Sequence, residues 1–421
     1  MLRWRIAILV SAAIAISYLD RQTLAVAIKA ISKDIPVTNV QFSNLQSAFL
    51  LAYAFMYAGG GKLADALGTR RGFIVIMLFW SLACASHGLA LTFTMLAVSR
   101  FALGMGEGGG FPTATRAVAE WFSVNERATA MGIINGGTAV GAVVAPPIIA
   151  LILTYANWRW IFYFTGSLGL LWTAWWRKSY FPPAEHPQLT AHERDKLPQS
   201  LVSSTDPKKI RWLDLFRFRE TWGIVVAKFL TDAAWYFYLF WLPKYLYDAR
   251  HFDIKAVGAI AWIPNAAAGA GCLLGGWFSS HLVRRKLTLN AARKISLGLS
   301  AAVMPMILLV TRAPIVWAIA IFSLAYFGQQ SWSTLVMVLP TDLFPSSVVG
   351  AVAGIIGFGG AIGGIAFGEL AGYLLDHGFG YETVFRLAAT FHVIAFLIIL
   401  VTVPRIGPLN MSQKFAIQTQ S

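Results

Sequence analysis

The sequence predicts an all-α membrane protein of twelve transmembrane helices, arranged as two six-helix bundles with pseudo-two-fold symmetry. Three observations lead to this prediction: a composition too apolar for a soluble domain, apolar stretches that recur along the chain, and an internal repeat. Of the 421 residues, 57% are hydrophobic and 13% are charged. The charged share is about half of the roughly 25% that soluble domains carry, so the chain cannot cover itself with a polar surface.

The apolar stretches are each about 20 residues long, which is enough to cross a hydrocarbon core of about 30 Å as a helix. A transmembrane β-barrel would instead show alternating segments of about ten residues. The first stretch contains charges and lacks a small-residue cleavage site, so we expect a permanent helix and not a signal peptide. The predicted spans are 6–29, 43–65, 72–92, 95–118, 128–152, 158–180, 221–247, 255–281, 293–311, 314–340, 347–375 and 382–404.

The net charge of +15 is concentrated in short loops next to the spans. This is the positive-inside pattern, and it indicates a lipid bilayer and not nucleic acid as the partner. It predicts a multi-pass protein of the inner (plasma) membrane with both termini in the cytoplasm. The basic groups on the cytoplasmic side are Arg70 with Arg71, Arg116 with Arg127, Arg177 with Lys178, a group from Lys208 to Arg219, and a group from Arg284 to Lys294.

An internal repeat relates the fifth span to the eleventh. GIINGGTAVG at 132–141 and GIIGFGGAIG at 354–363 are identical at six of ten positions, and the same offset aligns Glu120 with Asp342. The long polar stretch 182–219 is therefore interpreted as a cytoplasmic linker between a bundle at 1–181 and a bundle at 220–421. Two parallel halves of this kind are typical of secondary transporters that hold their substrate near mid-membrane.

The loop GKLADALGTRRG at 61–72 resembles the loop between the second and third helices of the major facilitator superfamily, although Ala66 stands where a basic residue is usual. Within that superfamily the chain resembles the anion:cation symporter group, which takes up hexuronates, galactonate, glucarate and related carboxylates. The segments that carry this resemblance are YLDRQ at 18–22, SRFALGMGEGGGFP at 99–112, EWFSVNERATAMG at 120–132 and KFLTDAAWYFYLFWLPKYL at 228–246. The resemblance implies the major facilitator fold and associates substrate and proton handling with Tyr18, Asp20, Arg21, Tyr53, Arg100 and Glu107.

Charged residues inside the spans require a reason, because each costs at least about 2.5–3.5 kcal/mol at the bilayer centre. Asp20 and Arg100 are expected at nearly the same depth, about 8–9 Å from the outer edge, so we predict that they pair. Glu107 follows Arg100 by two helical turns and lies near mid-membrane. An isolated carboxylate there favours its protonated form until a cation approaches, as a coupling site requires. Asp20, Arg100 and Glu107 are therefore the predicted proton-coupling residues.

Arg21 is the predicted anchor for a substrate carboxylate, because a guanidinium can bind it through two parallel hydrogen bonds. Tyr18 shares its helix face, and Tyr53 could add a hydroxyl donor. An open alternative is that the charges of the first half form a static buried network that holds the helices in register.

In the second half, several side chains offer hydrogen bonds and aromatic faces that suit the hydroxyls and ring of a sugar acid. They are Tyr236, Asn265, Gln329 and Trp332. For each of them, packing at a helix interface is an alternative that stays open. Lys228 and Asp232 stand four residues apart, so they either pair along their helix for structure or take part in function.

A charge cluster at the cytoplasmic rim is predicted to help close the inner side of the protein. Its members are Asp65, Arg70, Arg71, Glu120 and Arg127. A purely topogenic role for the arginines is the alternative.

No cofactor or metal is expected. Cys84 and Cys272 lie in apolar spans without metal-ligand spacing, and the G-x-G-x-x-G spacing at 104–109 follows no strand. We therefore expect a monomeric proton-coupled symporter of small organic anions, most of all a hexuronate or aldonate, and not an enzyme. Organic-anion exchange or efflux is the alternative, while a sensor or a membrane enzyme would need a signalling domain or a catalytic constellation that the sequence lacks.

Overall fold

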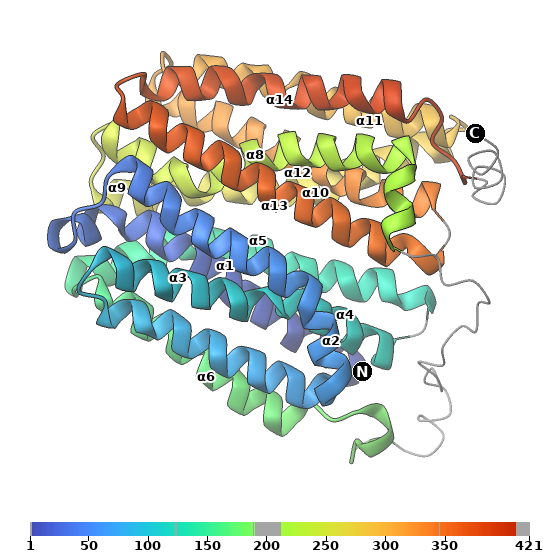
Figure 1. Cartoon of the computed structure of the whole chain (residues 1–421), viewed down its shortest axis with the longest axis horizontal. Coiled ribbons are helices and arrows are strands. Elements are labelled where there is room, and N and C mark those ends of the chain that lie inside the picture. Colours follow the sequence, from blue (N-terminus) through green and yellow to red (C-terminus); the bar gives the residue numbers. More distant parts are fainter. Residues whose placement is uncertain (1, 123, 188, 190–211, 345, 410–421) are drawn as a thin grey trace. The chain divides into compact units, whose positions relative to one another are not determined.

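The computed structural model describes residues 2–122, 124–187, 189, 212–344 and 346–409. Every regular element in these residues is a helix (Figure 1), as predicted. Eight helical segments in the described residues are long and apolar enough to cross a membrane. The protein is therefore a multi-pass membrane protein.

The helices follow the predicted spans closely. In the first half they are α1 (Leu2–Asp34), α2 (Asn39–Ser86), α3 (Phe93–Gly108), α4 (Gly110–Trp121), α5 (Val124–Tyr155) and α6 (Arg159–Ser179). In the second half they are α8 (Arg219–Asp248), α9 (Ile254–Ile260), α10 (Trp262–Arg284), α11 (Leu289–Ala302), α12 (Ile315–Leu343), α13 (Ser346–Asp376) and α14 (Gly380–Thr402). Short 3-10 turns lie at His87–Leu89, Pro183–Glu185, Trp212–Arg217 and Met304–Leu309.

Helix α2 carries both the second and the third predicted span. The chain bends inside it at Gly68, whose φ of 73° and ψ of 159° are not helical. A side chain would be strained at this positive φ, which glycine adopts readily. The expected loop between these spans is therefore a sharp kink and not an extended connection.

Two compact units make up the chain. Unit 1 comprises Met1–Asp206, Tyr236–Ala266 and Gly364–Val384, and unit 2 comprises Pro207–Trp235, Ala267–Gly363 and Phe385–Ser421. Unit 1 thus contains the helices of the first half together with all of α9 and parts of α8, α10, α13 and α14.

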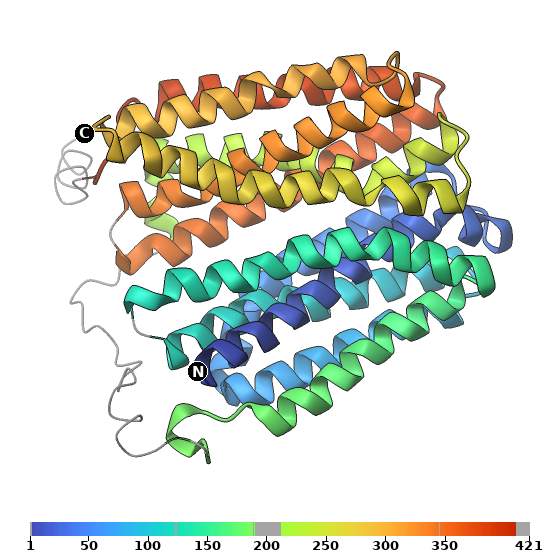
Figure 2. The ribbon, with the colours of Figure 1, turned by 180° about the vertical axis from the view of Figure 1, so that it is seen from behind.

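In unit 1, α1 packs along α5, and α2 packs along α3 and α6 (Figures 1 and 2). The interior of unit 2 is a cluster of apolar side chains from the 3-10 turn at Trp212–Arg217 and from α8, α11, α12, α13 and α14. Among its members are Leu215, Ile224, Leu335, Val352 and Ile399.

The start of α2 is held by two carboxylates of α13, both within unit 1. Asp376 accepts hydrogen bonds from the backbone nitrogen of Asn39 (3.0 Å), from its Nδ2 (2.7 Å) and from the backbone nitrogen of Val40 (2.8 Å). Glu369, two turns earlier, accepts one from Ser43 Oγ at 3.1 Å. A negative charge near a helix N-terminus also interacts favourably with the positive end of the helix dipole. These contacts therefore tie α13 to the start of α2.

Candidate functional site

A buried ion pair joins α1 to the end of α3. Arg21 Nε lies 2.7 Å from Glu107 Oε2, and the two side chains are only 4% and 0% exposed. Ser17, one turn before Arg21 on the same face of α1, donates a hydrogen bond to the same oxygen at 2.6 Å. The predicted isolation of Glu107 is wrong in this structure, because Arg21 and Ser17 reach across from α1.

Close packing of α3 against α2 positions this pair. A Cβ at Gly104 would clash with the carbonyl oxygen of Phe49, and a Cβ at Gly108 would lie 2.6 Å from that of Tyr53. Glycine is required at both positions, since any side chain would push the helices apart. The glycines around Glu107 thus bring it to the aromatic face of α2.

Three aromatic rings surround the Arg21 guanidinium. Its central carbon lies 4.5 Å from the ring centroid of Tyr53, 4.8 Å from that of Tyr18 and 5.4 Å from that of Phe49. Tyr236 of α8 also belongs to unit 1. Cation–π contacts stabilise a charge that is removed from water, so the predicted substrate residues Tyr18, Arg21 and Tyr53 do gather in one place.

The predicted pair of Asp20 and Arg100 is absent from this structure. Asp20 accepts hydrogen bonds from Trp80 Nε1 at 2.6 Å and from Cys84 Sγ at 3.4 Å. Arg100 is 0% exposed, and its three guanidinium nitrogens have no hydrogen-bond partner among the described residues. Its nearest cation–π contact is Phe49, at 5.7 Å. Equal depth did not ensure pairing, because Asp20 bonds to Trp80 and Cys84 of α2 instead.

Sequence reasoning missed Ser17, Phe49, Trp80 and Cys84 as partners of the buried charges. The signal for Ser17 was its spacing of four from Arg21, which places both on one face of α1. Trp80 and Cys84 show the same spacing on α2. Phe49 likewise lies four residues before Tyr53. A search for side chains four residues from a charged or aromatic residue could therefore have pointed to these partners.

The four predicted substrate residues of the second half are distributed over both units. Asn265 belongs to unit 1, where its Oδ1 accepts from Gln22 Nε2 at 3.5 Å. Gln329 hydrogen-bonds to His392 in unit 2. Trp332 lies in the apolar cluster of that unit, with its ring 5.6 Å from that of His392. Packing within unit 2 therefore engages Gln329 and Trp332, whereas Tyr236 and Asn265 belong to the unit that contains Arg21.

The predicted gate residues do not form one charge cluster among the described side chains. Glu120 accepts hydrogen bonds from Thr69 Oγ1 at 2.6 Å, from Arg116 Nε at 3.1 Å and from the Tyr180 hydroxyl at 2.5 Å.

Arg70 donates to the carbonyl oxygen of Arg177 at 2.7 Å and lies 3.9 Å from the ring centroid of Phe181, while Arg71 is exposed. The side chains of Asp65 and Arg127 lie outside the described residues. Arg70 and Glu120 thus tie α2 to α4 and to the end of α6, and a gating role for them stays a prediction.

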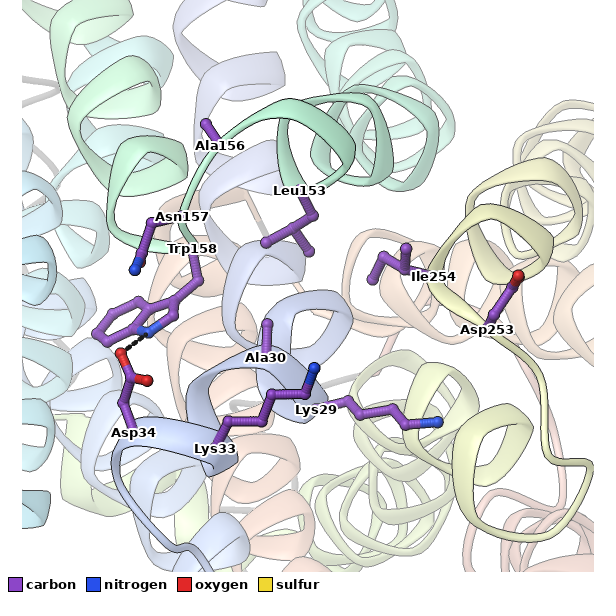
Figure 3. A pocket seen from close by; sticks show the side chains of 10 residues that line it. All are labelled: Lys29, Ala30, Lys33, Asp34, Leu153, Ala156, Asn157, Trp158, Asp253 and Ile254. Carbon is purple, nitrogen blue, oxygen red and sulfur yellow. Dashed lines mark hydrogen bonds between the residues drawn. The ribbon is translucent and has the colours of Figure 1, made fainter.

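A pocket of about 420 Å³ lies at the far end of α1, beside α5 and α9 (Figure 3). Lys29 and Lys33 are among the residues that line it. Asp34 at its rim accepts from Trp158 Nε1 at 2.9 Å and pairs with Arg159 at 2.7 Å. None of the predicted substrate residues lines this pocket, so it is distinct from the Arg21 site. Among the described residues, no group of three or more His, Cys, Asp or Glu is placed to hold a metal ion.

Comparison with known proteins identifies the family. The sequence profile of the Major Facilitator Superfamily matches residues 10–368. The hexuronate transporter of Escherichia coli (strain K12) is 29% identical over 412 residues, which cover 94% of this chain and 93% of that protein. The galacturonate transporter of Dickeya chrysanthemi is 31% identical over 307 residues, 72% of this chain and 89% of that protein.

Among solved structures, a bacterial homologue of the human lysosomal transporter Spinster superposes with a TM-score of 0.75. It is 16% identical, and the match covers 96% of this chain and 97% of that one. The fold is therefore the major facilitator fold, and the resemblance inferred from the sequence motifs is confirmed. The chain belongs to the Major Facilitator Superfamily, as a membrane transporter and not an enzyme.

Proposed function

We propose that this transporter is a proton-coupled symporter that takes up a sugar acid, such as a hexuronate or an aldonate, by alternating access. It acts as a monomer in the inner (plasma) membrane, with both termini in the cytoplasm. The similarity to hexuronate and galacturonate transporters supports this substrate class. The positive-inside distribution of the loop charges supports the orientation.

The Arg21–Glu107 pair carries the proposal. A substrate carboxylate needs the guanidinium of Arg21, and the Glu107 carboxylate occupies it at 2.7 Å. When Glu107 takes up a proton it loses the charge that holds Arg21, and the guanidinium becomes available for the anion. Proton binding and anion binding therefore favour each other, and by linkage the coupling is equal in both directions.

The surroundings of Arg21 suit a polyhydroxylated anion. Tyr18 and Tyr53 place aromatic faces within 5 Å of the guanidinium, and each carries a hydroxyl that can donate or accept. Aromatic rings with polar edges match a ligand that has both C–H faces and hydroxyl groups. A neutral hexose would leave Arg21 without a negative partner, so it is expected to bind poorly.

Uptake into proteoliposomes with an imposed pH gradient tests the proposal. The panel should contain labelled hexuronates, aldonates, aldarates and neutral hexoses. We expect accumulation of a sugar acid above equilibrium only when the outside is acidic. Preference for a neutral hexose would overturn the role of Arg21, and accumulation driven by an opposing anion but not by the pH gradient would establish exchange.

A further inference from the structure

Unit 2 buries an acid–base pair that the proposed mechanism does not use. Lys228 Nζ lies 2.8 Å from Asp232 Oδ1, and the side chains are 9% and 10% exposed. Both residues are on α8, one turn apart. Burying two charges in a membrane protein is costly even when they are paired, so the pair requires an explanation.

Structural support explains this pair poorly. A salt bridge between positions i and i+4 lies along a single helix, so it joins no helix to another. Among the described residues, the pair makes one polar contact to a second helix, the hydrogen bond from Lys228 Nζ to Ser333 Oγ of α12 at 2.9 Å. A serine hydroxyl could make such a contact with a neutral partner, so holding the helices together does not need the two charges.

Helix α13 leaves room for the pair. A Cβ at Gly360 would clash with Asp232 Oδ2 and lie 3.2 Å from Lys228 Cγ. At Gly359 a Cβ would lie 2.8 Å from a side-chain carbon of Val225. Consecutive glycines therefore allow α13 to approach α8 at the level of the charges, so three helices build the site.

The pair also has hydrogen-bonding capacity to spare. An ammonium has three protons, and Lys228 Nζ donates to Asp232 and Ser333. Within the described part of the chain, Asp232 Oδ2 accepts no hydrogen bond. A carboxylate from outside the chain can therefore take the third proton, and it can displace the Ser333 hydroxyl without leaving a buried charge unpaired.

We propose that Lys228 is an anion-binding residue of unit 2, and that Asp232 is the internal carboxylate that holds it when no anion is bound. The ligand class is the carboxylate of a sugar acid, an identity that rests on the proposed function. Asp232 competes with that carboxylate for the ammonium and repels it. Removing the charge of Asp232 should strengthen anion binding, whereas removing the charge of Lys228 should weaken it.

The test compares four variants of the full-length protein: K228Q, D232N, the double variant K228Q/D232N, and the control K244Q/D248N. The control removes another pair of the same i, i+4 spacing on α8, whose side chains are 13% and 40% exposed. Binding of labelled D-galacturonate and D-galactonate to purified protein is measured at equilibrium, next to a wider panel of organic anions, together with thermal unfolding.

We expect K228Q and the double variant to bind the anion at least about tenfold more weakly, as the loss of one charge-assisted hydrogen bond implies. D232N should bind as tightly as the wild type or more tightly, and the anion should raise its melting temperature further. The control should match the wild type. The double variant keeps the proposal testable if K228Q alone misfolds, because it leaves no unpaired charge in the buried site.

A purely structural pair would give the opposite pattern: both single variants impaired and the double variant restored to wild-type binding. That result overturns the proposal, as does a D232N variant that loses binding to the same extent as K228Q. If the wild type binds a different organic anion and D232N and K228Q shift its affinity in opposite directions, Lys228 keeps its role and the sugar-acid assignment fails. If the wild type binds no anion of the panel, both proposals fail.

Discussion

Arg21–Glu107 in unit 1 and Lys228–Asp232 in unit 2 are both buried acid–base pairs, but the first joins two helices and the second lies along one. The first links α1 to α3 across 86 residues of sequence, and the second spans a single turn of α8. When a pair between helices breaks, the helices lose a contact, so a change of charge can become a movement. When a pair along one helix breaks, only the local charge changes. The unit 1 pair is therefore suited to coupling, and the unit 2 pair to recognition.

The cations of the two pairs, Arg21 and Lys228, also differ in how strictly they orient a partner. Arg21 has a planar fork and lies among aromatic rings, which fixes the direction of its hydrogen bonds. Lys228 is a point charge on a flexible stem and shares its protons between a carboxylate and a hydroxyl. We therefore expect the Arg21 site to fix the orientation of a bound anion, and the Lys228 site to attract an anion without fixing its orientation.

The largest effect is expected when the unit 1 cation is removed. R21Q deletes two possible charge-assisted hydrogen bonds of about 1.5–3 kcal/mol each, so uptake should fall by about 100-fold or more. Initial rates of labelled hexuronate uptake measure this. R159Q is the matched control, because Arg159 pairs with Asp34 at the end of α1 and is 26% exposed, and it should change the rate by less than about twofold. Wild-type rates in R21Q would remove Arg21 from the substrate site.

The acid of the same pair is expected to separate coupling from binding. E107Q keeps the size of the side chain but cannot release a proton, so accumulation driven by a pH gradient should stop while exchange of labelled for unlabelled anion continues. The two assays on the same vesicles form the comparison. Full accumulation by E107Q would contradict a coupling role for Glu107.

A smaller effect is expected when a methyl group fills the space beside Lys228 and Asp232 in unit 2. G360A places a methyl group against Asp232 Oδ2 and should cost about 1–3 kcal/mol of stability by overpacking, with weaker anion binding as Lys228 and Asp232 are displaced. G357A is the control on the same helix, since nothing lies within 4 Å of a Cβ at Gly357. Equal melting temperatures for the two variants would show that α13 does not confine the pair.

The smallest effects are expected from the serine beside each pair, and they should differ in sign. Ser17 donates to Glu107, so S17A makes the carboxylate depend more on Arg21 and should weaken anion binding. Ser333 accepts from Lys228, so S333A frees an ammonium proton for the anion and should tighten binding. Each change is expected to be about 0.5–1.5 kcal/mol, measured as dissociation constants. Weakening by both variants would remove the distinction between the pairs.

The positions of the helices could be predicted from the sequence. Each span must form its own backbone hydrogen bonds inside the membrane, so it is recognised by its length and its hydropathy. The gathering of Tyr18, Arg21 and Tyr53 was also predictable, from helical spacing and the family motifs. The bend at Gly68 was not, since glycine permits a positive φ but does not require one.

The partners of the buried charges were harder to predict. The depth of a residue in the membrane follows from counting residues, and this count predicts Asp20 at the same depth as Arg100. The direction in which a side chain faces depends on how the helices pack, and in the structure Asp20 bonds to Trp80. The same reason explains why Glu107 meets Arg21, and why Gln329 is engaged by His392 in unit 2.

The contacts of Asp376 with the first turn of α2 have a consequence for any movement that separates α13 from α2. Such a movement would break three hydrogen bonds. Asp376 is exposed, so water can replace these donors, and we expect each bond to contribute about 0.5–1.5 kcal/mol net. About 1.4 kcal/mol changes a population tenfold, so the contact favours the arrangement in which the two helices stay together. A ligand that separates them must bind the separated arrangement more tightly by at least the same amount.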